Sequence, residues 1–133
     1  MNYLGQDRTD VQYAIKELSS SMSNPDMSAM IKAKRLIRYL LAVPRFVVKF
    51  RYQEKPVGIT AWSDTDFAGC VKSRKSTSGG LVTHGGHVIK SWSTMQSVIA
   101  LSSGEAEYYG MVKASSVAIG IRTLAGQIGK HQV

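Results

Sequence analysis

The first 43 residues carry apolar side chains at helical spacing. Spacings of three and four predict a helix over residues 10–22, with Thr9 and Gln12 forming a capping box at its start. Asn24-Pro25 is typical of the beginning of a second helix, and Pro44 ends it. The expected core-facing residues are Val11, Ala14, Ile15, Leu18 and Met22 in the first helix, and Met30, Ala33, Ile37, Leu40 and Leu41 in the second. The pattern therefore predicts an N-terminal helical pair over residues 1–43.

Beyond Pro44, short runs of β-branched and aromatic residues replace the helical pattern. The predicted strands cover residues 46–52, 57–62, 81–83, 87–92 and 97–101. The third and fourth of these form a hairpin around Gly85-Gly86. From Ser103, apolar positions predict a helix to about Gly126. Residues 46–133 thus form a second unit, a sheet with a packed C-terminal helix, and the fold class is α/β, more strictly α+β.

Composition and cysteine usage limit the class of protein. Hydrophobic residues make up 44% of the 133-residue chain and charged residues 20%, which is typical of a globular protein and argues against disorder. The single cysteine, Cys70, excludes an internal disulfide and suits a reducing compartment. No apolar run approaches the ~20 residues that a bilayer requires, and no signal peptide precedes the first helix. We therefore expect a soluble, intracellular protein without a membrane partner.

The positive charge of the chain is concentrated in one stretch. The net charge is +8, and eight cations lie between residues 32 and 55, where Glu54 is the only acid. Such a density attracts phosphate backbones, and the attraction weakens sharply with salt. A solvated basic face explains the same pattern equally well. Charge alone thus proposes a nucleic-acid partner without establishing it.

Four acids lie beyond residue 54, in two pairs. Asp64 and Asp66 follow the second predicted strand, and Glu105 and Glu107 open the last helix. If this helix packs across the sheet, the pairs converge, and hard cations such as Mg²⁺ prefer carboxylate oxygens. Two such ions ~3.5–4 Å apart can clamp an in-line phosphoryl displacement. The alternative is structural, because the helix dipole favours acids in a first turn and an Asp after a strand is often a turn residue.

The histidines, serines and tryptophans indicate no further chemistry. The 3 histidines lack zinc-site spacing, the Gly-x-Ser-x-Gly nucleophile elbow is absent, and no Gly-rich phosphate loop occurs. Trp62 and Trp92 could stack on bases or sugars. We expect both of them to pack in the core instead.

Four short motifs follow one another in the second unit. They are WSDTDFAG at residues 62–69, RKSTSG at 74–79, SWS at 91–93 with Gln96-Ser97, and LSSGEAEY at 101–108. In this order they resemble the segments SDADWAG, RKSTSG, SWSSKKQ and LSSTEAEY in the ribonuclease H domain of copia-type retrotransposon Pol polyproteins. The first unit, which contains Asn24-Pro25 and KRLIRYL at 34–40, is similar to the stretch just upstream. That stretch is the C-terminal end of the reverse transcriptase, in its thumb or connection region.

The resemblance implies a metal site. Asp64 would be the first catalytic and metal-binding carboxylate and Glu107 the second, with Asp66 and Glu105 in supporting positions. In the family, such ligands hold paired Mg²⁺, or Mn²⁺ in its place, for hydrolysis of the RNA strand of an RNA–DNA hybrid. The family also needs two later carboxylates, and no Asp or Glu follows Glu107 in this chain. We therefore expect a truncated ribonuclease H-like mixed sheet that binds the metal weakly and does not cleave RNA alone.

The resemblance also implies partners. The cations expected to contact the phosphates of an RNA–DNA hybrid are Lys34, Arg35, Arg38, Lys72, Arg74 and Lys75. Solvated surface charges remain the alternative for each of them. The rest of the Pol polyprotein is the expected protein partner, in a cytoplasmic particle or the nucleus. An alternative function is a basic, non-catalytic module that binds nucleic acid or is vestigial.

Overall fold

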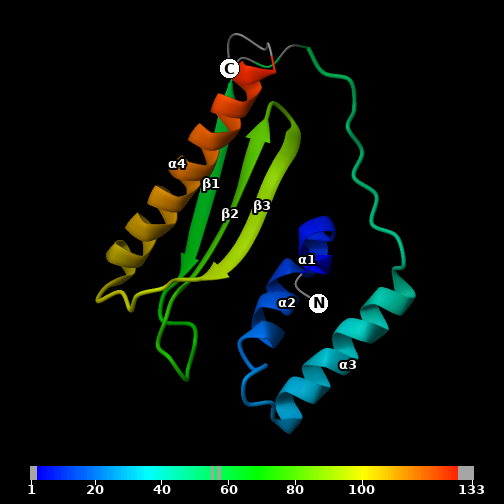
Figure 1. The fold of residues 1–133 in the computed structure, drawn as a ribbon, viewed down its shortest axis with the longest axis vertical. Coiled ribbons are helices and arrows are strands. Elements are labelled where there is room, and N and C mark those ends of the chain that lie inside the picture. Colours follow the sequence, from blue (N-terminus) through cyan, green and yellow to red (C-terminus); the bar gives the residue numbers. More distant parts are fainter. Residues whose placement is uncertain (1–2, 55, 57, 129–133) are drawn as a thin grey trace. The chain divides into compact units, whose positions relative to one another are not determined.

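The computed structural model describes residues 3–54, 56 and 58–128. The chain divides after Lys49 into two compact units, the first helical and the second built on a β-sheet, as Figure 1 shows. The elements are α1 (Leu4–Asp7), η1 (Thr9–Val11), α2 (Gln12–Ser19), α3 (Met27–Ala42), β1 (Ile59–Asp66), β2 (Thr77–His84), β3 (His87–Met95) and α4 (Ser103–Gln127). The predicted α+β class is confirmed. None of the described helices is both long and apolar enough to cross a membrane.

A small apolar core holds the helical unit. Val11, Ile15 and Leu18 lie on one side of η1 and α2, and Leu36 of α3 packs against them. Each of these side chains is at most 9% exposed. The predicted stripe of the first helix is therefore confirmed except at Met22, which is 69% exposed.

The stripe predicted for α3 is only partly right. Ala33 and Leu40 pack against the core, and Leu36, which was not predicted, is buried. Three predicted members are instead largely exposed, namely Met30, Ile37 and Leu41. α2 has only 8 residues, so it covers a narrow strip of the longer helix.

Both helix starts differ from the predicted caps. Thr9 begins a 3₁₀ turn, and α2 follows at Gln12 without a side-chain cap, so the capping box is not formed. α3 is capped by Asp26 and not by Asn24. The Asp26 carboxylate accepts a hydrogen bond from the main-chain N–H of Ala29 at 2.7 Å. Asp and Asn cap helices by the same hydrogen bond. The predicted type of cap is therefore right, but its position is two residues too early.

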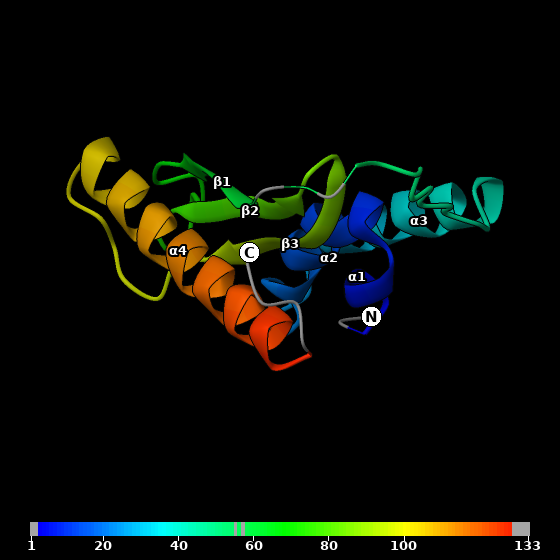
Figure 2. The ribbon, with the colours of Figure 1, turned by 90° about the horizontal axis from the view of Figure 1, so that it is seen from above.

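The second unit is a 3-stranded antiparallel sheet in the order β1-β2-β3. α4 packs on one face of it, mainly against β1 and β2, and Figure 2 shows the helix beside the strands. β2 and β3 form the predicted hairpin, in which Gly85 takes a φ of 60° that favours glycine. The register pairs Asp64 with Gly79 and Asp66 with Thr77. Both strand pairs of the described residues are antiparallel, so the parallel strand pair expected in a mixed sheet does not occur in this part of the chain.

The core of this unit depends on one glycine. Val82 is 0% exposed, and with Trp92 and Ala114 it forms the core between the sheet and α4. A Cβ on Gly80 would collide with the ring of Trp92 and would lie 2.7 Å from the main-chain oxygen of Trp62. A main-chain atom cannot move aside as a flexible side chain can. The Trp92 ring therefore packs over Gly80 only because that position has no side chain.

Two predicted strands are not formed. Residues 46–52 lie outside any strand, and their large apolar side chains are at least 40% exposed, namely Phe46, Val47, Val48, Phe50 and Tyr52. β-prone residues form a strand only beside a hydrogen-bonded neighbour, and no described strand pairs with them. Residues 97–101 instead form bends and irregular structure before α4. The strand predicted over 57–62 is longer than expected, so Asp64 lies within β1 rather than after it; Val57 lies outside the described residues.

Candidate functional site

The C-terminal end of β1 and the first turns of α4 lie side by side (Figure 1). The hydroxyl Oγ1 of Thr65 in β1 donates to the main-chain oxygen of Ala106 in α4 at 3.3 Å. The acids that flank these two residues in sequence are Asp64, Asp66, Glu105 and Glu107. One contact therefore joins the two segments that carry all four acids predicted for the site.

Small side chains allow this close approach of helix and strand. Ala106 and Gly110, one turn apart, are buried on the side of α4 that faces the sheet. A Cβ on Gly110 would lie 2.7 Å from Thr65 Oγ1 and 3.8 Å from the hydroxyls of Ser63 and Ser78. Side chains alternate between the two faces of a strand, so Ser63 and Thr65 share the face that contacts α4. Small polar residues of the sheet thus meet small residues of the helix.

Gln96 makes a second connection to the same helix. Its Nε2 donates to the Ala106 oxygen and to Ser78 Oγ, both at 2.9 Å. Its main-chain N–H donates to the oxygen of Ser76 at 2.8 Å. The residue is 9% exposed, and no described residue donates to its buried Oε1. The first turns of α4 are therefore tied to β1 through Thr65, and to β2 and the end of β3 through Gln96.

Glu105 has a structural role at the start of α4. Its Oε2 accepts from the main-chain N–H of Leu101 at 2.7 Å, and its Oε1 accepts from the Tyr109 hydroxyl at 3.1 Å. Ser102 Oγ in turn accepts from the N–H of Glu105 at 3.1 Å, which caps the helix. The hydrogen bond to this carboxylate raises the pKa of Tyr109. Glu105 is thus occupied by capping, as the structural alternative predicted.

The other three acids differ in their surroundings. The Asp66 carboxylate lies against Gly69 in the turn after β1, where a Cβ would collide with it. Asp64 is exposed on the face of β1 opposite to the one that contacts α4, and Glu107 is half-buried on α4. Neither makes a hydrogen bond or ion pair with a described residue. Within the described part of the chain, no three acids, histidines or cysteines form a metal-binding group. The metal site therefore stays a prediction.

The predicted phosphate-contacting cations occur in both units. They are Lys34, Arg35 and Arg38, exposed on α3, and Lys72, Arg74 and Lys75 in the loop between β1 and β2. The loop is closed by main-chain hydrogen bonds from Arg74 to Cys70 at 2.7 Å and from Cys70 to Lys75 at 3.2 Å. It therefore holds its cations at a defined place, directly after the strand that carries Asp64.

The two tryptophans have different environments. Trp92 is 9% exposed and packs in the core, as predicted. Trp62 is 61% exposed, so the prediction of core packing is wrong for it. It lies two residues before Asp64 on the same face of β1, and α4 covers the other face. Trp62 is therefore open to an aromatic contact beside this acid.

Sequence patterns do not reveal the roles of Gln96 and Lys113 equally well. Lys113 was not predicted, although the helical period contains a signal for it. It lies three residues after the buried Gly110, so it faces the sheet. Its Nζ donates to Thr94 Oγ1 in β3, and partial burial lowers its pKa. Gln96 lies in one of the motifs, but no periodicity indicates that its side chain reaches α4.

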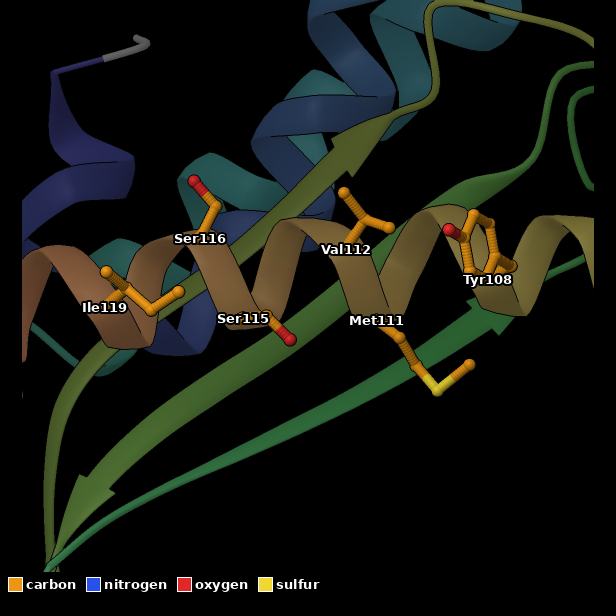
Figure 3. Close-up of a pocket in the computed structure, with 6 residues that line it drawn as sticks. All are labelled: Tyr108, Met111, Val112, Ser115, Ser116 and Ile119. Carbon is orange, nitrogen blue, oxygen red and sulfur yellow. The ribbon is translucent and has the colours of Figure 1, made fainter.

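An open hollow of about 560 Å³ lies on another side of α4 (Figure 3). Its lining comes from this helix alone and consists of Tyr108, Met111, Val112, Ser115, Ser116 and Ile119. It contains no acid or cation, and it is offset around the helix from Ala106 and Gly110. This hollow is an exposed apolar helix face and not part of the carboxylate site.

Comparison with known proteins finds relatives among transposon proteins. The chain is 33% identical over 129 residues to the Retrovirus-related Pol polyprotein from transposon RE1 of Arabidopsis thaliana, covering 97% of this chain and 9% of that protein. It is 30% identical over 125 residues to the corresponding polyprotein from transposon TNT 1-94 of Nicotiana tabacum, again over 9% of the relative. It is also 34% identical over 112 residues to the Secreted RxLR effector protein 161 of Plasmopara viticola, covering 78% of that protein. No family model matches the chain, and no solved structure is significantly similar to it.

Proposed function

The chain belongs to the copia-type retrotransposon Pol polyproteins, and we propose that it joins the C-terminal end of their reverse transcriptase to the N-terminal part of their ribonuclease H domain. The observation that supports this proposal is the hydrogen bond of 3.3 Å between Thr65 and Ala106. It brings the motif with Asp64 beside the motif with Glu107, as a shared metal site would require. The parent polyprotein would hydrolyse the RNA strand of an RNA–DNA hybrid.

The donor set suits one hard divalent cation. Asp64 and Glu107 are carboxylates without a protein partner in the described part of the chain. Mg²⁺ is commonly held by one or two carboxylates together with waters and substrate phosphates. Asp64 and Glu107 start from opposite faces of β1. Because β1 is an outer strand of the described sheet, both side chains can reach a cation at its outer edge. When bound there, Mg²⁺ or Mn²⁺ would neutralise phosphate charge and activate water.

The remaining residues of the proposed site would orient the helix and bind the substrate. Thr65 and Gln96 hold the first turns of α4 against the sheet, so that Glu107 keeps its place. The loop cations beyond β1 would attract the hybrid phosphates toward Asp64. The exposed ring of Trp62 would stack on a base or sugar.

We propose that the chain alone does not cleave RNA. Paired ions each need near-octahedral oxygen ligation, and two carboxylates supply too few protein ligands for both. Glu105 does not fill the gap, because both of its carboxylate oxygens already accept hydrogen bonds at the start of α4, and Asp66 keeps the supporting position that the resemblance implies. The proposed contribution of this chain is thus half of a catalytic site together with a basic surface.

A gel assay with a labelled RNA–DNA hybrid and Mg²⁺ tests this proposal. We expect the wild-type chain to leave the RNA strand intact. Turnover that is abolished by Asp64→Asn would contradict the proposal, because two carboxylates would then suffice. Turnover that survives Asp64→Asn would indicate a contaminating nuclease, which a repeat with Glu107→Gln identifies.

Fluorescence anisotropy with the same hybrid tests the basic surface. Replacing Lys72, Arg74 and Lys75 by glutamine should weaken binding and reduce the salt slope by about 0.9 for each phosphate that the loop no longer neutralises. The control replaces two cations that are exposed elsewhere in the same unit, Lys90 and Arg122, by glutamine, and the two variants are compared per charge removed. Equally weakened binding in both variants would refute a specific role of the loop.

One relative favours a second function. The Plasmopara viticola protein is matched over 78% of its length, so a similar stretch makes up most of a protein that is named a secreted effector. As a second function we propose a basic, non-catalytic module that binds nucleic acid, which the net charge of +8 supports. Hybrid binding that is equal in Mg²⁺ and EDTA, and equal for wild type and Asp64→Asn, would favour this module over the metal-dependent site.

A further inference from the structure

We infer that Thr65 and Gln96 form a positioning clamp that fixes Glu107 relative to Asp64, an inference that rests on the proposed metal site. We call the pair of donors, Thr65 Oγ1 and Gln96 Nε2, the Ala106 clamp. The two side chains donate to the Ala106 oxygen at 3.3 Å and 2.9 Å. They are positioning residues, because neither is itself a proposed ligand.

The clamp is not needed to form the helix. A carbonyl inside an α-helix accepts from the N–H four residues later, and this bond alone satisfies the helix. The two further donors, one in β1 and one directly after β3, therefore serve to attach the helix to its neighbours. Gln96 is 9% exposed and Ala106 is 0% exposed, so water does not compete for these bonds.

The clamped carbonyl lies next to both proposed ligands. It belongs to the peptide group that joins Ala106 to Glu107, and this group is planar. Holding its oxygen fixes the direction in which the Cα of Glu107 leaves the peptide plane. In β1, Thr65 is the residue directly after Asp64. A shift of the clamp would therefore move both carboxylates relative to each other.

The chemistry of position 96 is specific. The Ala106 oxygen can only accept, so the amide nitrogen of Gln96 must face it, and Nε2 uses a hydrogen on Ser78 as well. A methionine at position 96 would have a similar length and no donor. Thr65→Val likewise keeps the shape of the side chain and removes its donor, whereas Thr65→Ser keeps the hydroxyl.

The test is a Mg²⁺ titration of the full chain, followed by NMR at the side-chain carboxyl carbons of Asp64 and Glu107. Wild type should show concerted shifts at both carbons. Gln96→Met and Thr65→Val should weaken Mg²⁺ binding about tenfold. This is the lower end of the loss when a hydrogen-bond partner of a metal ligand is removed, because the clamp holds the main chain beside a ligand and not the ligand itself. Thr65→Ser should bind like wild type. Ile121→Val, which loosens the core away from the clamp, should also retain wild-type affinity.

The outcomes separate the clamp from the metal site itself. If the wild-type chain shows the shifts and both Gln96→Met and Thr65→Val bind Mg²⁺ with unchanged affinity, the clamp is overturned and the metal site stays intact. Equal weakening in Ile121→Val would also overturn it, because general loosening would then explain the weaker binding. Absence of shifts in wild type would overturn the metal site, and the clamp with it. If Gln96→Met does not fold, the comparison of Thr65→Val with Thr65→Ser decides.

Discussion

Gly110→Ala sets two effects in α4 against each other. Glycine inside a helix is about 1 kcal/mol less favourable than alanine, so the substitution should stabilise the helix itself. At this position, however, the new Cβ would lie 2.7 Å from Thr65 Oγ1. Overpacking of this kind costs about 1–3 kcal/mol. Together the two effects predict a change between about zero and a destabilisation of about 2 kcal/mol.

Gly120→Ala is the matched control in the same helix. Gly120 is exposed, and no atom lies within 4 Å of its added Cβ, so the variant should be more stable by up to about 1 kcal/mol. The effect on helix propensity is common to both variants. Their difference, about 1–3 kcal/mol, therefore measures the steric effect at the contact of α4 with β1. Thr65→Ala added to Gly110→Ala should recover about 1 kcal/mol or more, whereas Thr65→Val keeps a methyl group there and should recover none.

Urea denaturation followed by tryptophan emission measures these free energies. Both tryptophans, Trp62 in β1 and Trp92 in β3, lie in the sheet, so the signal reports the second unit. Equal stabilisation by Gly110→Ala and Gly120→Ala would refute the reasoning. β1 and α4 would then not touch at this point, and the approach of the strand segment that carries Asp64 to the start of α4 would lose its support.

Three other expectations concern the core, the helical unit and the sheet edge. Gly80→Ala should displace Trp92, lower the stability of the second unit by about 1–3 kcal/mol and red-shift the emission; Gly79→Ala, whose Cβ approaches nothing closer than 3.9 Å, should do neither. The pKa of Asp10 is lowered from 3.8 to about 2, chiefly by the hydrogen bond from Arg8, so this stabilisation is fully present above pH 3.8 and lost as the pH falls through about 2. Asp10→Asn should lower the stability of the helical unit by about 0.2–1 kcal/mol at pH 7 and by clearly less near pH 2, as measured by hydrogen exchange of α3; an undiminished difference at pH 2 would contradict this. The free edge of β1 predicts marginal stability, and a calorimetric transition well above ~65 °C would refute it.

Local patterns in the sequence determined the helices, the hairpin and the motifs. Helical spacing places the last helix from Ser103, as observed, and Gly85-Gly86 marks the turn between β2 and β3. These features depend on residues close together in the chain, so their chemistry is readable without a fold. The order of the four motifs likewise needs only the sequence, and it identified the family to which the relatives belong.

The tertiary structure decided which faces are covered and which side chains meet. The run over 46–52 is as β-prone as β1, but it forms no strand because no described neighbour pairs with it. Trp62 is exposed and Trp92 buried, although the sequence makes both equally suited to a core. Gln96 reaches Ala106 only because β3 ends beside the first turn of α4. Burial and long-range hydrogen bonds depend on neighbours distant in sequence, and local propensity contains no information about them.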